Sequence, residues 1–187
     1  MNAKNDVILL RNVRLSFPTL WTPKAGDEPG AKPKYSATFL LDKKANSREI
    51  EALKAGIENV KKTSDKLKGN KRAIKSPLRD GSEKSHLDGY NDSNMFITAR
   101  NHRKVGVVDA VRDETGELRI LTEQDGRPYA GCIVNARVEC YGYNHPKSGP
   151  GISFSLLNVQ FVKDGDPFGD APVSATDGFE PIEESAI

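Results

Sequence analysis

Alternating apolar and polar residues near the N-terminus predict a β-strand. In segment 7–17 the apolar residues share one side and the polar residues the other: Val7, Leu9, Val13, Leu15 and Phe17 against Asn12, Arg14 and Ser16. We expect Pro18 to end this strand and a loop rich in Pro and Gly, containing Trp21, to follow as far as Pro33. Alternation resumes in segment 35–41, which predicts a second strand.

The period then changes from two to about 3.6. Ile50, Leu53, Ile57 and Val60 recur at helical spacing, and Asn46 precedes them as a candidate N-cap. This pattern predicts one amphipathic helix over about 47–65. The following segment, about 66–94, has few apolar residues, so we expect a long basic loop that orders around a ligand.

Further strands are expected at 95–100, 105–111, 129–143 and 152–162, with a short one at 118–122. Even positions of segment 129–143 are small and mostly apolar, so they face the core, whereas its odd positions present aromatic and polar side chains. Apolar residues of segment 152–162 change parity after Leu156, which indicates a β-bulge. About six strands, one inserted helix and long loops favour a mainly β fold, an OB-fold-like small barrel.

Charge is distributed unevenly along the chain although the net charge is only +2. Residues 163–187 hold seven acidic residues and one basic residue, and residues 61–84 hold nine basic and three acidic ones. We therefore expect a basic folded domain over 1–162 that binds a polyanion, and a disordered acidic tail over 163–187. A solvated loop and an inert end would explain the same charges.

Signatures of catalysis, metal binding and membrane insertion are missing from the sequence. Cys132 and Cys140 share the inward side of one strand and lie too far apart to pair, and no CxxC, HExxH or phosphate-loop motif occurs. No apolar run reaches the roughly 18 residues of a membrane span. We expect a soluble protein with no catalytic residue, cofactor, metal or membrane partner. A metal-dependent nuclease or nucleotide-processing barrel using acids near Asp109 is the alternative.

Single-stranded nucleic acid is bound without sequence preference by a basic groove and by aromatic rings on which bases stack. Both ingredients occur here, although each aromatic residue could instead pack against the core. The candidate residues for binding single-stranded DNA are Arg14, Trp21, Lys71, Arg72, Lys75, Arg79, Phe96, Arg100, Arg103, Lys104, Arg137, Tyr141 and Tyr143.

The acidic tail offers two roles that exclude each other at any instant. It can lie over the basic groove as a mimic of a phosphate strand, or its apolar tip can dock into a partner protein. The candidate residues of this tail are Asp177, Glu180, Glu183, Glu184 and Ile187. On this model, binding of DNA releases the tail.

Six collinear segments resemble a phage and prophage family long labelled a domain of unknown function, whose members are regarded as OB-fold single-stranded-DNA-binding proteins. The segments are NVRLSFPTLWTPK (12–24), KYSATFLLDK (34–43), YNDSNMFITARN (90–101), VGVVDA (105–110), YAGCIVNARVECYGYN (129–144) and GISFSLLNVQFVKDGDPFG (151–169). This resemblance implies sequence-independent binding of single-stranded DNA during phage replication or recombination, in the cytoplasm of a bacterial host.

The same resemblance implies that the tail contacts replication partners such as a phage DNA polymerase, helicase or recombinase. The tail departs from the usual bacterial pattern, because it ends in Ser185, Ala186 and Ile187 rather than in an aromatic residue after a run of Asp. A homodimer is also compatible with the sequence. A phage structural or assembly protein, whose basic loop is incidental, is a further alternative.

Overall fold

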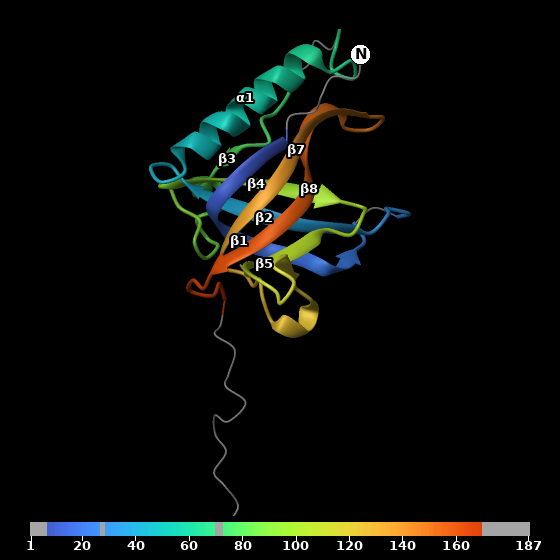
Figure 1. The fold of residues 1–187 in the computed structure, drawn as a ribbon. Coiled ribbons are helices and arrows are strands. Elements are labelled where there is room, and N and C mark those ends of the chain that lie inside the picture. Colours follow the sequence, from blue (N-terminus) through green and yellow to red (C-terminus); the bar gives the residue numbers. More distant parts are fainter. Residues whose placement is uncertain (1–6, 27–28, 70–72, 170–187) are drawn as a thin grey trace, which may run out of the picture.

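The computed structural model describes residues 7–26, 29–69 and 73–169. Within them it contains one α-helix, two short 3-10 helices and eight strands (Figure 1). In chain order these elements are β1 (Val7–Lys24), β2 (Lys34–Asp42), α1 (Ser47–Thr63), β3 (Arg79–Asp80), η1 (Gly81–Lys84), β4 (Asn94–Asn101), β5 (Gly106–Arg112), β6 (Leu118–Ile120), η2 (Glu123–Asp125), β7 (Ile133–His145) and β8 (Gly149–Lys163).

Five of the strands close into a barrel. β1 pairs antiparallel with β2 and β7, β2 with β4, and β7 with β8. The ring closes where β4 runs parallel to β8, with Ala99 opposite Phe154 and Arg100 opposite Ser155. β3 adds to β4 on one side, and the β5–β6 pair adds to β8 on the other. This closed barrel with one helix confirms the expected mainly β, OB-fold-like architecture.

The first strand differs from its expected pattern at both ends. Ile8 and Leu10 are buried, whereas Val7 and Leu9 are exposed, so the prediction that Val7 and Leu9 face the core is wrong. The parity changes because the pairing with β7 shifts register between Leu10 and Val13. Asn12 has a φ of 51° at this shift, and its backbone N–H donates to Asn135 Oδ1 at 2.9 Å.

A second irregularity lies where the strand was expected to end. β1 continues through Pro18 to Lys24, so Trp21 belongs to a strand rather than to a loop. Pro18 is tolerated because the pairing with β2 shifts register between Ser16 and Thr19, which removes the need for its missing N–H. Phe17, which was expected to face the core, is exposed at this shift.

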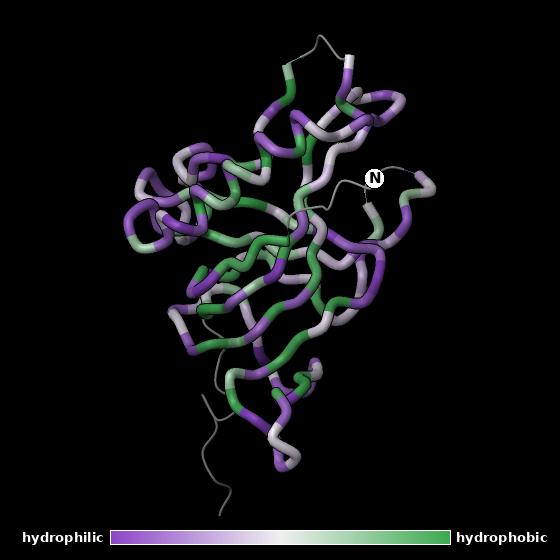
Figure 2. Tube along the Cα trace, turned by 45° about the horizontal axis from the view of Figure 1, so that its top comes forward, coloured by the Kyte–Doolittle hydropathy of each residue, from purple (hydrophilic) through white to green (hydrophobic). Residues whose placement is uncertain are grey.

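The helix lies across one end of the barrel (Figure 1). Its predicted apolar positions, Ile50, Leu53, Ile57 and Val60, are all buried in the core, which confirms the periodicity. The backbone of Gly56 approaches the barrel closely, since a Cβ there would lie 2.9 Å from Cδ1 of Ile8. Hydrophobic and hydrophilic residues alternate along the barrel strands (Figure 2), and the hydrophobic ones make up most of the buried positions.

The predicted alternation of β7 is confirmed. Val134, Ala136, Val138, Cys140 and Gly142 are buried, whereas the residues between them are half-buried or exposed. The pairing of β7 with β8 shifts between Arg137 and Val138, opposite the predicted parity change after Leu156. Both cysteines are buried and no disulfide joins them, and burial raises the pKa of the Cys132 thiol to about 11.

The segment expected to be a long loop is partly built into the fold. Residues 79–94 form β3, η1 and a series of turns that pack on β4, so the prediction of a long loop is wrong for this part. Asp80 and Glu83 form a capping box at η1, and Lys43 Nζ lies 2.6 Å from Asp80 Oδ2. This ammonium group holds the pKa of Asp80 below its usual range. The Tyr90 hydroxyl lies 3.1 Å from Ser16 Oγ and ties the segment to β1.

The chain continues in contact with the barrel after β8. Phe168 N donates to Ala130 O at 3.0 Å, and Gly169 N donates to Asp88 Oδ2 at 2.9 Å. The expected tail therefore begins no earlier than residue 170, and residues 170–187 lie outside the described residues. No helix among the described residues is long and apolar enough to cross a membrane.

Candidate nucleic-acid interface

Strand pairing places rows of side chains across the outward surface of β1, β2 and β4. One row consists of Ser16, Thr38 and Thr98, in which the two threonine hydroxyls lie 2.9 Å apart. Ser16 and Thr38 point away from the barrel core but are buried, and the Tyr90 hydroxyl bonds to Ser16. The next row consists of Thr19, Ser36 and Arg100. In OB-folds the second and third barrel strands, with the loop that joins the first two, form the surface that binds oligonucleotides. Here those strands are β2 and β4, and that loop lies between β1 and β2.

A basic pocket lies at the end of this surface, beside the loop between β1 and β2. Its volume is about 250 Å³, and four cations line it: Lys24, Lys32, Lys34 and Arg100. Among the described residues none of the four forms an ion pair. Thr19 and Ser36 add hydroxyl groups to the lining. Four positive charges in one concavity, none of them ion-paired with another described residue, attract phosphate groups.

The pairings of β2 with β1 and with β4 explain how the pocket forms. Lys24 pairs with Lys34 across β1 and β2, and Ser36 pairs with Arg100 across β2 and β4. His102 Nδ1 lies 3.2 Å from Pro33 O, which fixes the loop against the end of β4. The candidate residues inferred from the sequence included Arg100 but not Lys24, Lys32 or Lys34. Several lysines close together in a segment rich in Pro and Gly were the sequence signal that could have indicated a basic loop.

Other predicted cations lie near this end of the barrel. Arg103 and Lys104 are exposed in the turn after β4. Lys104 and Trp21 line a second concavity of about 420 Å³ together with residues of β5 and β6. Trp21 is half-buried and packs against the core, so its indole offers only part of its surface.

Arg14 is held by the chain that follows β8. Its guanidinium donates to Gly131 O at 3.1 Å and to Asp166 O at 2.7 Å. The Phe168 ring lies over it, 4.2 Å from Cζ to the ring centroid. Arg14 lies on the outward surface as predicted, yet much of its hydrogen-bonding capacity is used within the protein.

Phe96 is 2% exposed, so the prediction that its ring is free for base stacking is wrong. It does point away from the main core, as its parity indicated, but segment 79–94 covers it. Leu40 and Tyr90 bury it in a small separate cluster. Arg79 lies 5.2 Å and Lys84 5.0 Å from the centroid of its ring. Arg79 also forms an ion pair with Glu83 at 2.6 Å.

Tyr141 and Tyr143 lie on the outward side of β7, as their parity predicted. Both are half-buried, and their ring centroids are 6.5 Å apart. The Tyr143 ring covers Gly151 on β8, where a Cβ would lie 2.4 Å from ring atoms. Arg137 is exposed on the same side of β7. These three residues form a second surface with stacking and cationic groups.

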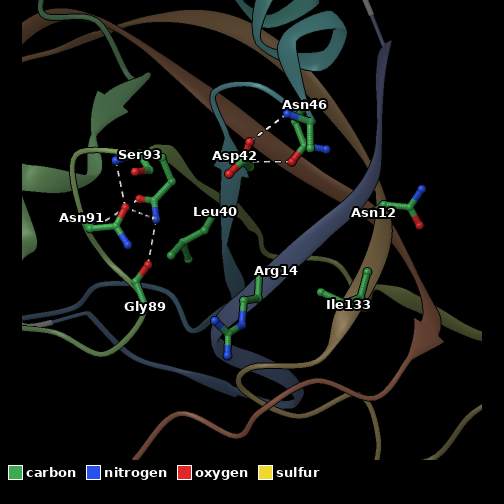
Figure 3. A pocket seen from close by; sticks show the side chains of 11 residues that line it. Asn12, Arg14, Leu40, Asp42, Asn46, Gly89, Asn91, Ser93 and Ile133 are labelled. Atoms are coloured by element: carbon green, nitrogen blue, oxygen red, sulfur yellow. Dashed lines mark hydrogen bonds between the residues drawn. The ribbon is translucent and has the colours of Figure 1, made fainter.

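An amide-rich pocket of about 330 Å³ lies on the other side of Arg14, between the start of α1 and the turn at 89–94 (Figure 3). Most of its amides serve the fold. Asn46 Oδ1 accepts from Asp42 N, and Asn94 Nδ2 donates to Gly89 O. The N–H groups of Lys44 and Ala45 bond to the Asp42 carboxylate and lower its pKa. The basic pocket, whose four cations form no ion pair within the described part of the chain, is therefore the stronger candidate for binding an anionic strand.

Asp109, near which the nuclease alternative placed its acidic residues, is a buried residue held in ion pairs. It is 3% exposed, and its carboxylate lies 2.6 Å from Arg127 and 3.6 Å from Arg119. These two cations neutralise it and join β5 to the segment after β6. Among the described residues no three His, Cys, Asp or Glu side chains gather as metal ligands do.

Lys75 is exposed, whereas Lys71 and Arg72 lie outside the described residues. The tail residues named above, Asp177, Glu180, Glu183, Glu184 and Ile187, also lie outside the described residues. The roles of all these side chains in DNA binding stay predictions.

Comparisons with solved structures show the same barrel in phage proteins. The single-stranded-DNA-binding protein from bacteriophage Enc34, solved in complex with single-stranded DNA, is 28% identical with a TM-score of 0.72, over 87% of this chain and 89% of that one. Its C-terminally truncated form is 27% identical with a TM-score of 0.70, over 87% and 88%. The single-stranded-DNA-binding protein gp2.5 of bacteriophage T7 shares the fold, with a TM-score of 0.50 at 15% identity over 97% and 100%.

Sequence comparison extends the likeness to nearly the whole chain. Protein p50 of Acyrthosiphon pisum secondary endosymbiont phage 1 is 41% identical over 186 residues, which span 94% of this chain and 93% of p50. A family model described as "Enterobacter phage Enc34, ssDNA-binding protein" matches residues 6–186. The chain therefore belongs to the Enc34 family of phage single-stranded-DNA-binding proteins.

Proposed function

We propose that this protein binds single-stranded DNA without sequence preference and coats it during phage DNA replication or recombination in the host cytoplasm. The observation that carries this proposal is the basic pocket of Lys24, Lys32, Lys34 and Arg100 on the outward surface of the barrel. Family membership supports it, because the Enc34 protein was solved with single-stranded DNA. The known family members are DNA-binding proteins and not enzymes, and this chain is accordingly not an enzyme.

Electrostatic attraction and base stacking both contribute to the affinity for DNA in this mechanism. The basic pocket binds phosphates, and Arg103 and Lys104 extend the positive surface beyond β4. Stacking on Tyr141 and Tyr143 contributes about 1–3 kcal/mol for each base that stacks. Neither term reads base edges, so binding tolerates any sequence.

The acidic tail acts as a competitor and as a partner-binding segment in this proposal. Residues 170–187 contain five acidic residues and no basic residue. Gly169, the last described residue, bonds to Asp88 on the same side of the barrel as Arg14 and Phe168. A strand of DNA that enters the basic surface displaces the tail, which then binds a phage polymerase, helicase or recombinase. Self-association as a homodimer belongs to the same proposal.

Titration of labelled oligo-dT with the full-length protein at several salt concentrations tests DNA binding. We expect a dissociation constant of about 1 µM or lower at 50 mM salt, and a log affinity that falls linearly with log salt, by about 0.7 for each phosphate neutralised. Lys32→Ala and Lys34→Ala should each reduce this slope by about 0.7.

Lys54→Ala is the matched control, because Lys54 is exposed on α1 and pairs with Glu51. Its slope should equal that of the wild type. Absence of binding at 50 mM salt would refute the proposed function, and equal slopes for all variants would exclude the basic pocket as the phosphate site.

A further inference from the structure

Phe17 has a conformation that is rare for a bulky residue. It lies in the middle of β1, is 56% exposed, and has a φ of 45°. Among the described residues it is the only aromatic side chain that is exposed rather than half-buried or buried. The pairing of β1 with β2 shifts here by one residue, from Ser16 opposite Thr38 to Thr19 opposite Ser36.

Two features of the sequence oppose this conformation. A bulky L-residue rarely adopts a positive φ, because its Cβ then crowds the backbone. Pro18 follows directly, and the residue before a proline favours extended backbone. The side chain stays more than half exposed, and no ring or cation contact to Phe17 occurs among the described residues. Strain of this kind clusters where a side chain must be presented to a ligand.

The surroundings of Phe17 indicate the ligand. Thr19, two residues further along β1, lines the basic pocket together with Ser36 and Arg100. An exposed aromatic residue therefore lies on the same strand as a residue that lines this cationic pocket, two positions before it. A cationic groove beside an aromatic platform is the combination that binds a single strand, since the groove attracts phosphates and the ring stacks on a base.

We propose that Phe17 is a base-stacking platform for single-stranded DNA at the mouth of the basic pocket. The register shift in β1 turns the ring outward, and the packing of the barrel compensates for the cost of the positive φ at Phe17. Phosphates flanking the stacked base lie toward Lys24, Lys34 and Arg100. This inference rests on the proposed function and adds to it a stacking residue that the alternation of β1 had assigned to the core.

The test compares two strands of equal length and charge, oligo-dT and an abasic oligonucleotide. Phe17→Ala should weaken binding of oligo-dT by about 5- to 150-fold, the range that corresponds to the loss of one stack. Binding of the abasic strand should change less than twofold, because phosphate contacts remain. Phe17→Tyr should keep the affinity for oligo-dT within about threefold of the wild type.

A matched control and a stability measurement separate stacking from folding. Val111→Ala removes an apolar side chain that is 55% exposed on β5, and it should leave both affinities unchanged. Phe17→Gly should unfold at the same urea concentration as the wild type or a higher one, because glycine accepts a positive φ, yet it should bind oligo-dT as weakly as Phe17→Ala.

Unchanged affinity of Phe17→Ala for oligo-dT, or an equal loss on both strands, would overturn the inference while leaving DNA binding by the wild type intact. Loss of self-association in light scattering, with unchanged oligo-dT affinity, would also overturn it and would assign Phe17 to a contact between copies. Failure of the wild type to bind either strand would defeat the proposed function as well.

Discussion

The Arg14 guanidinium lies 4.2 Å from the centroid of the Phe168 ring, although 154 residues separate the two in sequence. Phe168 also packs against the small cluster of Leu40, Tyr90 and Phe96. Replacing it with alanine removes a cation–π contact and apolar burial. We expect Phe168→Ala to lower the free energy of unfolding by about 2 kcal/mol, measured by urea denaturation.

Phe168→Leu is the control for that experiment, since leucine keeps apolar contact with the cluster but gives up the interaction with Arg14. Its loss should be roughly half as large. If Phe168→Ala unfolds at the same urea concentration as the wild type, the contacts after β8 contribute nothing to stability.

Asp109 should prove structural when its charge is removed. Asp109→Asn leaves Arg127 and Arg119 without the buried carboxylate that they share. We expect the free energy of unfolding to fall by about 2–4 kcal/mol, while affinity for oligo-dT is retained. Glu114→Gln, in the exposed turn between β5 and β6, should change neither quantity. Cleavage of labelled single-stranded DNA by the wild type with Mg²⁺, abolished by Asp109→Asn, would contradict this assignment.

Local patterns were sufficient to predict α1 and β7. The spacing of Ile50, Leu53, Ile57 and Val60 identifies the buried side of the helix, because all four residues follow the regular helical period. Strict alternation in β7 likewise identified Tyr141 and Tyr143 as outward residues. Both elements are regular over their whole cores, so the sequence alone specifies which side is buried.

Irregular pairing and contacts between distant segments could not be read in this way. The outward position of Phe17 depends on a one-residue shift against β2, and a single shift reverses the side that each following residue faces. Burial of Phe96 depends on Tyr90, a lone aromatic residue in a polar segment, folding back onto β4. Lys34 joins Lys24 and Arg100 only because two strand pairings bring them together, and Lys32 precedes Lys34 in the adjoining loop.

The ion pair between Lys43 and Asp80 should make stability sensitive to acid. Lys43 Nζ donates to the Asp80 carboxylate and lowers its pKa in the folded protein relative to the usual value of 3.8. Because the folded pKa is lowered, the stabilisation is fully present above pH 3.8 and is lost as the pH falls below it. Asp80→Asn should therefore show a smaller decrease in urea midpoint than the wild type between pH 5 and pH 3.

Glu51→Gln provides a comparison for that measurement, since Glu51 pairs with Lys54 on the exposed side of α1 and its side chain is 71% exposed. Its acid dependence should follow the wild type. Parallel curves for Asp80→Asn and the wild type would show that the pair with Lys43 does not contribute to acid sensitivity.

Tyr141 and Tyr143 provide a test of the second surface. Both rings are half-buried on the outside of β7, so their removal should cost little stability. Tyr141→Ala and Tyr143→Ala should each weaken binding of oligo-dT by about 5- to 150-fold while the urea midpoint changes little. A loss of stability that parallels the loss of affinity would indicate that the rings support the barrel. Phenylalanine at either position should preserve binding, because the stacking surface remains.

Deleting residues 170–187 should strengthen binding of oligo-dT. The deletion removes five negative charges and no positive charge from a chain whose net charge is +2, while the described contacts of Phe168 and Gly169 remain. A competitor that acts by charge is screened by salt, since the Debye length falls from about 10 Å at 0.1 M to about 3 Å at 1 M. The gain in affinity should therefore be largest at 50 mM salt and vanish toward 1 M. A full-length chain with the five acids replaced by Asn and Gln should reproduce the deletion if charge is the cause. Equal affinities of all three proteins at 50 mM salt would exclude a competing tail.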